Sequence, residues 1–192
     1  QQGWACWFCG PESEESMQLP PLEGELVRLR THEPEDEPHV YRWINDPEVT
    51  EHLAARYPYS HAQEREFLAI PLTYGNVSLT VVTKAEGRPI GNVSLRGASP
   101  ETRACDLGIM IGEKDCWDRG YGTDIMRTIC RFGFEMMNLH RIELDVFAGN
   151  ARARRVYEKV GFVVEGTRRQ AHYQRGRYLD VVVMGLLEGE LR

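Results

Sequence analysis

The distribution of apolar residues along the chain predicts short strands interrupted by helices. The clearest strand spans 140–147, where apolar residues at 142, 144 and 146 alternate with charged residues, as in a strand with one buried face. Similar runs bounded by turn residues predict further strands at 26–30, 77–83, 89–96, 104–112, 162–167 and 178–187. A charged loop is expected to join the last two of these strands.

A helical period of apolar residues is clearest after residue 121. Ile125, Met126 and Ile129 begin a series at i, i+3 and i+4 spacing that continues to position 137. A second helix is expected over 150–160, because Asn150 suits the N-cap and Gly161 suits the residue after the C-cap. Shorter helices are expected at 34–45, 46–53 and 61–70. This order of elements predicts an α/β protein of the α+β type, built on one mixed sheet.

Composition limits the classes of function. The chain has 192 residues, of which 42% are hydrophobic and 27% charged, which suits one globular domain. The formal charge of −6 argues against a protein that coats nucleic acid, because such proteins neutralise phosphates with excess Lys and Arg. No apolar stretch is long enough to span a membrane, so we expect no membrane partner.

The first residues differ from the rest of the chain. Residues 1–18 are expected to be an arm or a remnant outside the fold, with one domain over 19–192. Cys6 and Cys9 form a lone C-x-x-C pair. A zinc site requires a second such pair or two histidines at suitable spacing, and the sequence shows neither. Five cysteines are also an odd number for a disulfide scaffold. We therefore expect no metal and a reduced, cytoplasmic protein.

A G-x-G pair at Gly120 and Gly122 precedes the long helix. A helix N-terminus exposes unpaired N–H groups and a positive dipole end, and glycine lets a phosphate approach the backbone closely. The Lys of a P-loop and the third glycine of a dinucleotide-binding fingerprint are missing. Taken alone, the pair fits a phosphate-binding turn or a tight loop that merely starts a helix.

Four ordered segments carry a resemblance to a known family. They are Trp117-Asp-Arg-Gly-Tyr-Gly122, Asn150-Ala-Arg-Ala-Arg-Arg-Val-Tyr-Glu-Lys-Val-Gly-Phe162, the strand after Gly176, and the first strand after Leu22. Together they resemble the GNAT superfamily of acyl-CoA N-acyltransferases, in the branch of ribosomal-protein N-terminal acetyltransferases (RimJ/RimL type). The first segment resembles the family's pyrophosphate-binding signature, although Trp117 replaces its usual Gln or Arg.

The resemblance implies a fold and a reaction. The fold would be a largely antiparallel sheet of about seven strands, with helices on both faces and a splayed, bulged strand at the cofactor site. The reaction would move an acetyl group from acetyl-CoA to a primary amine, either a protein N-terminus or a small molecule, and a homodimer would be compatible. The implied cofactor-binding residues are Ile109, Met110, Ile111, Trp117, Asp118, Arg119, Gly120, Tyr121, Gly122, Thr123, Asn150, Arg154 and Tyr157.

Three side chains are candidates for catalysis. Tyr157 would protonate the leaving thiolate, because a phenol with a pKa of about 10 stays protonated at neutral pH. Asn150 caps its helix and would also bond the cofactor or a water. Asp106, raised in pKa by burial, would take a proton from the ammonium; the alternative is a carboxylate facing solvent. Backbone N–H of Ile109 or Met110 would polarise the thioester.

For several nearby residues, the sequence allows more than one role. Gly108 fits a bulge, since strand glycines often mark one. Arg152, Arg154 and Arg155 either reach a cofactor phosphate or form a solvated face. His172 and Tyr173 either line an acceptor pocket or lie in solvent. The alternative function is a catalytically silent CoA-binding sensor.

Overall fold

A computed structural model describes residues 22–55 and 57–192, so the expected arm at 1–18 and the Cys6–Cys9 pair lie outside the described residues. The core of the fold is a seven-stranded sheet of order β1-β2-β3-β4-β5-β7-β6. Only β4 and β5 are parallel neighbours, which confirms the mixed, largely antiparallel sheet. The strands are β1 Val27–Arg30, β2 Asn76–Thr83, β3 Pro89–Arg96, β4 Ala104–Ile111, β5 Arg141–Phe147, β6 Val163–Gln174 and β7 Arg177–Leu187.

In the described part of the chain, four α-helices accompany the sheet: α1 Glu37–Ile44, α2 His61–Leu68, α3 Tyr121–Glu135 and α4 Ala151–Val160. Three 3₁₀ turns, η1 Pro34–Asp36, η2 Val49–His52 and η3 Lys114–Cys116, complete the set. The helix expected over 46–53 is only the η2 turn, because Leu53 N–H bonds the Thr50 carbonyl three residues back and the chain then becomes extended.

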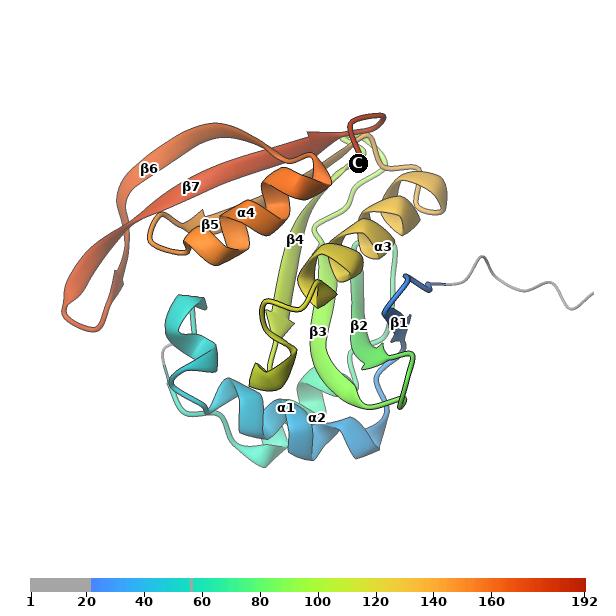
Figure 1. The fold of residues 1–192 in the computed structure, drawn as a ribbon, viewed down its shortest axis with the longest axis vertical. Coiled ribbons are helices and arrows are strands. Elements are labelled where there is room, and N and C mark those ends of the chain that lie inside the picture. Colours follow the sequence, from blue (N-terminus) through green and yellow to red (C-terminus); the bar gives the residue numbers. More distant parts are fainter. Residues whose placement is uncertain (1–21, 56) are drawn as a thin grey trace, which may run out of the picture.

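The helices cover the two faces of the sheet unequally (Figure 1). On one face, α3 and α4 bury a continuous core that draws alternate residues from most strands. On the other face, Trp43 of α1 packs with Met110 of β4. Beyond β4 this second face carries charged residues of β5, such as the exposed Asp145. The sheet therefore has a covered half and a polar half on that side.

The parallel strands β4 and β5 pair over only three residues. Ala104 to Asp106 lie opposite Arg141 to Glu143, and no pairing continues beyond them. The expected splay is therefore present. The expected bulge at Gly108 is not, because the β3–β4 register runs unshifted from Asp106 to Ile111. Gly108 instead leaves room for a neighbour: a Cβ there would lie 3.1 Å from Arg96 Nη2.

The last two strands form a long hairpin that extends beyond the end of β5 (Figure 1). The charged loop expected over 168–177 is wrong: only Arg175 and Gly176 form the turn, both with positive φ as two-residue hairpins favour. Near the tip, Gln174 Nε2 donates to the Leu53 carbonyl at 3.2 Å and Arg175 Nη2 to the Pro47 carbonyl at 2.7 Å. The hairpin thus holds the η2 segment in place.

Candidate active site

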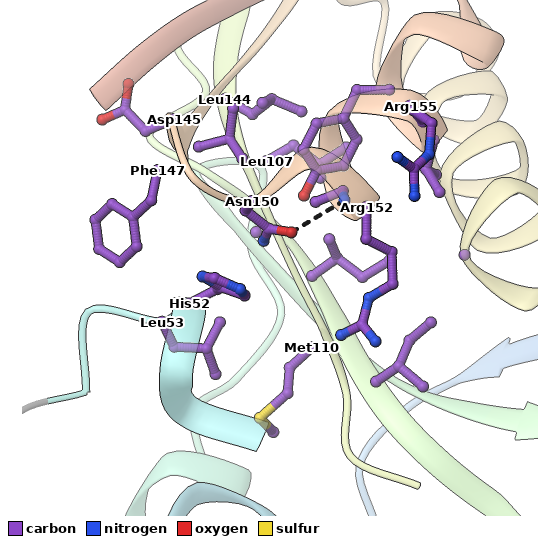
Figure 2. A pocket seen from close by; sticks show the side chains of 18 of the residues that line it. His52, Leu53, Leu107, Met110, Leu144, Asp145, Phe147, Asn150, Arg152 and Arg155 are labelled. Atoms are coloured by element: carbon purple, nitrogen blue, oxygen red, sulfur yellow. Dashed lines mark hydrogen bonds between the residues drawn. The ribbon is translucent and has the colours of Figure 1, made fainter. Parts of the chain in front are cut away.

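The splay between β4 and β5 opens a cavity of about 980 Å³. Its walls come from β4, β5, the N-terminal ends of α3 and α4, the η2 segment and the β6–β7 hairpin. Figure 2 shows Asp145 and Phe147 on one side of Asn150, and Arg152 and Arg155 on the other. The cavity therefore has two sides of different character. Its size is that of a cleft for a sizeable ligand.

The N-terminus of α3 meets the cavity without a side-chain cap. Asp118 and Gly120 both have positive φ, at 56° and 88°, and Gly120 serves as the N-cap. The first backbone bond of the helix runs from Asp124 N–H to the Gly120 carbonyl at 3.1 Å. The three preceding N–H groups consequently lack acceptors within the helix, and Gly122 and Thr123 line the cavity. This end of the cavity is built to accept an anion.

Positive side chains from α4 reinforce that end. Arg152 lies 4.2 Å from the centre of the Trp117 ring, and Trp117 Nε1 donates to the Ile111 carbonyl at 2.9 Å. Arg155 also lines the cavity (Figure 2). Basic residues at a helix N-terminus oppose the helix dipole, so two of them here gain little unless an anion sits nearby.

Three expected cofactor contacts are placed elsewhere. Arg154 pairs with Glu158 at 3.7 Å and does not line the cavity, because it lies on a different stripe of α4 from Arg152 and Arg155. Arg119 turns its guanidinium to the Asp115 carbonyl at 3.3 Å. Tyr121 packs against the core. None of these three side chains is among the cavity-lining residues.

The backbone of β4 alternates in direction and so separates the two candidate amides. Gly112 N–H bonds the Ile90 carbonyl of β3 at 2.8 Å, and the Met110 carbonyl lies against Gly91 of β3. Met110 therefore directs its backbone groups toward β3. Ile109 and Ile111 direct theirs toward the open gap, as the bond from Trp117 to the Ile111 carbonyl demonstrates. Of the two amides considered, Ile109 is the one that faces the cavity.

Tyr157 lies in the wall of the cavity on α4. Only 8% of its surface is exposed, and burial raises its pKa to about 12. In the part of the chain that the structure describes, no residue hydrogen-bonds its hydroxyl. Its ring packs near Phe162, with centroids 6.1 Å apart. The phenol is thus neutral at physiological pH and free to bond a ligand.

Asn150 both caps α4 and lines the cavity. Its Oδ1 accepts from Ala153 N–H at 3.1 Å, as the sequence predicted (Figure 2). Its Nδ2 has no bonded partner among residues 22–55 and 57–192. The cap fixes the side chain in one position, which leaves the amide NH₂ as a donor toward the cavity.

Asp106 is exposed at the surface of the cavity, which is the solvent-facing alternative that the sequence left open. Partial desolvation and the nearby carboxylates of Glu143 and Asp145 raise its pKa, while Arg96 and Arg168 act in the opposite direction. The carboxylate is exposed because Asp106 alternates with the buried Cys105 and Leu107 and so faces away from α3.

The remaining wall contains residues that the sequence did not single out. His52 and Leu53 enter from η2, and Phe147 packs against His172 with ring centroids 4.9 Å apart. His172 therefore lines the cavity, whereas Tyr173 does not and packs edge-on against Tyr178 at 5.0 Å. Local periodicity could not reveal these contacts, since they depend on the bent hairpin.

Within the described ranges, no cluster of His, Cys, Asp and Glu side chains could hold a metal ion. Over the same ranges, no helix is both long and apolar enough to cross a membrane.

Sheet order, splayed strand and cavity together define an acyltransferase fold, and comparison with known proteins agrees. Residues 27–163 match the family model described as an acetyltransferase (GNAT) domain. The chain therefore belongs to the GNAT acetyltransferase family, whose members are acyl-CoA N-acyltransferases that use acetyl-CoA.

Its relatives act on different amines. A solved spermidine N-acetyltransferase from Vibrio cholerae, in complex with CoA and spermine, has a TM-score of 0.75 and 25% identity, over 86% of this chain and 97% of that one. The L-amino acid N-acetyltransferase AaaT of Escherichia coli is 31% identical over 54% of this chain and 65% of its own length. The putative ribosomal N-acetyltransferase YdaF of Bacillus subtilis is 30% identical over 55% of this chain and 57% of its own length.

Proposed function

We propose that this protein transfers the acetyl group of acetyl-CoA directly to a primary amine while both substrates are bound. The acceptor is a protein N-terminus, as in the RimJ/RimL type of enzyme, or a small-molecule amine. One observation carries the proposal: a single cavity joins the uncapped N-terminus of α3, the open edge of β4 and the neutral Tyr157.

The cofactor side of the cavity fits the diphosphate of acetyl-CoA. The free N–H groups at Gly122 and Thr123 donate to phosphate oxygens, and glycine at position 122 permits their close approach. Arg152 and Arg155 add positive charge beside them. When bound, acetyl-CoA supplies an activated acetyl group as a thioester.

Residues around the gap then assist the transfer. The Ile109 N–H polarises the thioester carbonyl, a kind of contact worth roughly 3–4 kcal/mol in other acyl-transfer enzymes. A carboxylate or water relay removes a proton from the ammonium, so that its lone pair can attack; Asp106 is our candidate. As the carbon–sulfur bond breaks, Tyr157 donates its proton to sulfur and regains one from solvent.

The cysteines support direct transfer over an acyl-enzyme route. Cys116 is the thiol at the cavity wall, yet burial and then Asp115 raise its pKa. Burial also raises the pKa of Cys105 to about 12. A thiol must ionise to act as a nucleophile, so neither is poised for acylation.

The test is an amine panel incubated with the full chain and acetyl-CoA, with free thiol and acetylated product both measured. We expect thiol release that depends on an amine, and intersecting initial-velocity lines, which indicate that both substrates bind before transfer. Calorimetry in parallel measures CoA binding. CoA binding without thiol release from any amine would favour the silent sensor, and parallel lines would favour an acyl-enzyme.

A further inference from the structure

Arg96 and Asp106 are direct partners across the β3–β4 ladder and both line the cavity. The Arg96 guanidinium extends toward the splay, where a Cβ at Gly108 would lie 3.1 Å from its Nη2. No hydrogen bond or ion pair joins either side chain to any other described residue. One cation and one anion are therefore held side by side, with the Arg96 guanidinium next to Gly108 and Asp106 three residues before Ile109 on β4.

The other charged groups on this side of the cavity are already paired. Asp145 forms an ion pair with Arg168, and Glu48 pairs with Lys114 at 2.6 Å. Among the described strand residues that line the cavity, Arg96 and Asp106 are the two charged ones without an ion-pair partner; the other unpaired charges, Asp118, Arg152, Arg155 and Lys159, come from α4 and the turn before α3. A ligand that enters here meets one free positive and one free negative charge at neighbouring positions.

We propose that the acceptor is an α-amino acid, or a closely similar amine with an adjacent carboxylate, and that Arg96 determines this specificity. The inference rests on the proposed function and names its substrate class. The Arg96 guanidinium binds the carboxylate in a two-point contact that its planar fork favours. Asp106 receives the ammonium next to it. Directly opposed residues in a sheet have Cβ atoms about 4.5–5.5 Å apart, which matches the short span between the two groups of an amino acid.

The rest of this wall suits an uncharged side chain. Leu53, Phe147 and Val181 line the same side of the cavity and present apolar surface. Polyamines fit less well, because they carry several positive charges and the one unpaired carboxylate here lies beside a guanidinium. The spermine bound by the Vibrio cholerae relative is accordingly a poor guide to this chain's acceptor.

The bonds and protons of the acetyl transfer can be followed through these groups. The ammonium gives one proton to Asp106, the nitrogen forms a bond to the acetyl carbon, and the carbon–sulfur bond breaks. The nitrogen loses a second proton to solvent as sulfur gains one from Tyr157, which solvent restores. Asp106 then returns its proton to solvent, so the products are an N-acetyl amino acid, CoA and one released proton, and Arg96 holds the carboxylate throughout.

The decisive experiment compares each amino acid with the amine formed by its decarboxylation. The pairs are L-phenylalanine with phenethylamine and L-leucine with isoamylamine, and spermidine serves as the polycation. We expect the amino acid of each pair to have a kcat/KM roughly tenfold to 100-fold higher, since a charge-assisted contact is worth that factor. Equal or faster acetylation of the amines or of spermidine would overturn the inference.

Variants of Arg96 test whether this side chain causes the preference for amino acids over their decarboxylated amines. Arg96→Gln should raise KM for the amino acids by roughly tenfold or more and change KM for the decarboxylated amines much less, while Arg96→Lys restores part of the difference. Arg28→Gln is the matched control, because Arg28 is exposed on β1 and pairs with Glu23 far from the cavity. An equal loss for amino acids and amines in Arg96→Gln would refute the assignment.

A binding measurement separates this inference from the proposed function. Calorimetry of L-phenylalanine into the protein saturated with CoA should give binding that Arg96→Gln weakens and Arg28→Gln does not. If amines release thiol but amino acids neither react nor bind, the inference alone fails. If no amine releases thiol, the proposed function fails, and amino acid binding that depends on Arg96 would still support the site.

Discussion

Helices α3 and α4 both begin at the same cavity, but their N-termini are built differently. α3 begins after Gly120, which has positive φ and no side chain to satisfy the first N–H groups. α4 begins after Asn150, whose Oδ1 accepts from Ala153 N–H. The first end leaves its donors for a ligand, whereas the second satisfies one of its own donors.

The two helices also differ in the charged residues of their first turns. The first turn of α3 carries Asp124, which is buried and accepts bonds from the N–H groups of Glu25, Leu26 and Val27 at 2.9, 2.7 and 3.0 Å. The first turns of α4 carry arginines and no acidic residue. The carboxylate of α3 is thus occupied in anchoring β1, while the arginines of α4 supply charge to the cavity. In the proposed mechanism, the N-terminus of α3 binds the diphosphate and α4 positions Tyr157 as the proton donor.

The largest effect should come from Tyr157→Phe. The ring and its packing remain, but the proton donor is lost, so we expect kcat to fall by about 10²- to 10⁴-fold with CoA affinity nearly unchanged. Because burial raises the pKa of Tyr157 to about 12, the wild-type rate should show no alkaline loss from this group up to pH 10 or so. Steady-state rates across pH and CoA calorimetry measure both. Unchanged turnover would remove Tyr157 from the mechanism.

The sequence predicted those parts of the site that leave a local pattern, such as a capping residue or a regular period of apolar positions. The caps of α4 at Asn150 and Gly161 and the strand β5 were predicted from residue type and alternation alone. The hairpin was missed because most residues of β6 are exposed, so no buried face produced a period of two. Polar residues on both faces looked like a loop.

Tertiary contacts set the remaining limits. The open edge of β4 exists because pairing with β5 ends at Asp106, which no local pattern encodes. His52 lines the cavity from a segment that the tip of the hairpin contacts through the Leu53 carbonyl, a contact distant in sequence. The pairing of Arg96 with Asp106 likewise depends on the register of β3 with β4, which the sequence analysis did not set.

Asp124→Ala tests the anchoring role given to α3. The change leaves three backbone N–H groups without their acceptor, one of them buried at Val27. We expect a loss of about 2–4 kcal/mol in the free energy of unfolding, measured by denaturant titration, with smaller loss in Asp124→Asn because one oxygen remains. If stability held and CoA binding disappeared instead, the carboxylate would belong to the cofactor site and the contrast between the helices would be wrong.

Gly122→Val tests the binding role of the same helix. A Cβ at position 122 would meet Ile111 and Val156 at 3.6 Å, which is ordinary contact, so Gly122→Ala should fold and bind CoA. The two methyl groups of valine add bulk beside the N–H groups that we assign to the diphosphate. We expect CoA affinity to fall by roughly tenfold or more in calorimetry, with the unfolding midpoint close to that of the alanine control. Normal affinity in a folded valine variant would refute the diphosphate assignment.

Asn150→Ala should have the smallest effect and separates the two roles of this side chain. Loss of the cap is expected to lower the free energy of unfolding by about 1 kcal/mol. Asn150→Ser restores an oxygen acceptor for Ala153 N–H but carries no amide NH₂, so it should recover most of that stability. Comparing kcat and CoA affinity of the two variants then isolates Nδ2. If serine restores both stability and activity, Asn150 acts as a cap alone; if activity stays low in a stable Asn150→Ser protein, its NH₂ bonds a ligand in the cavity.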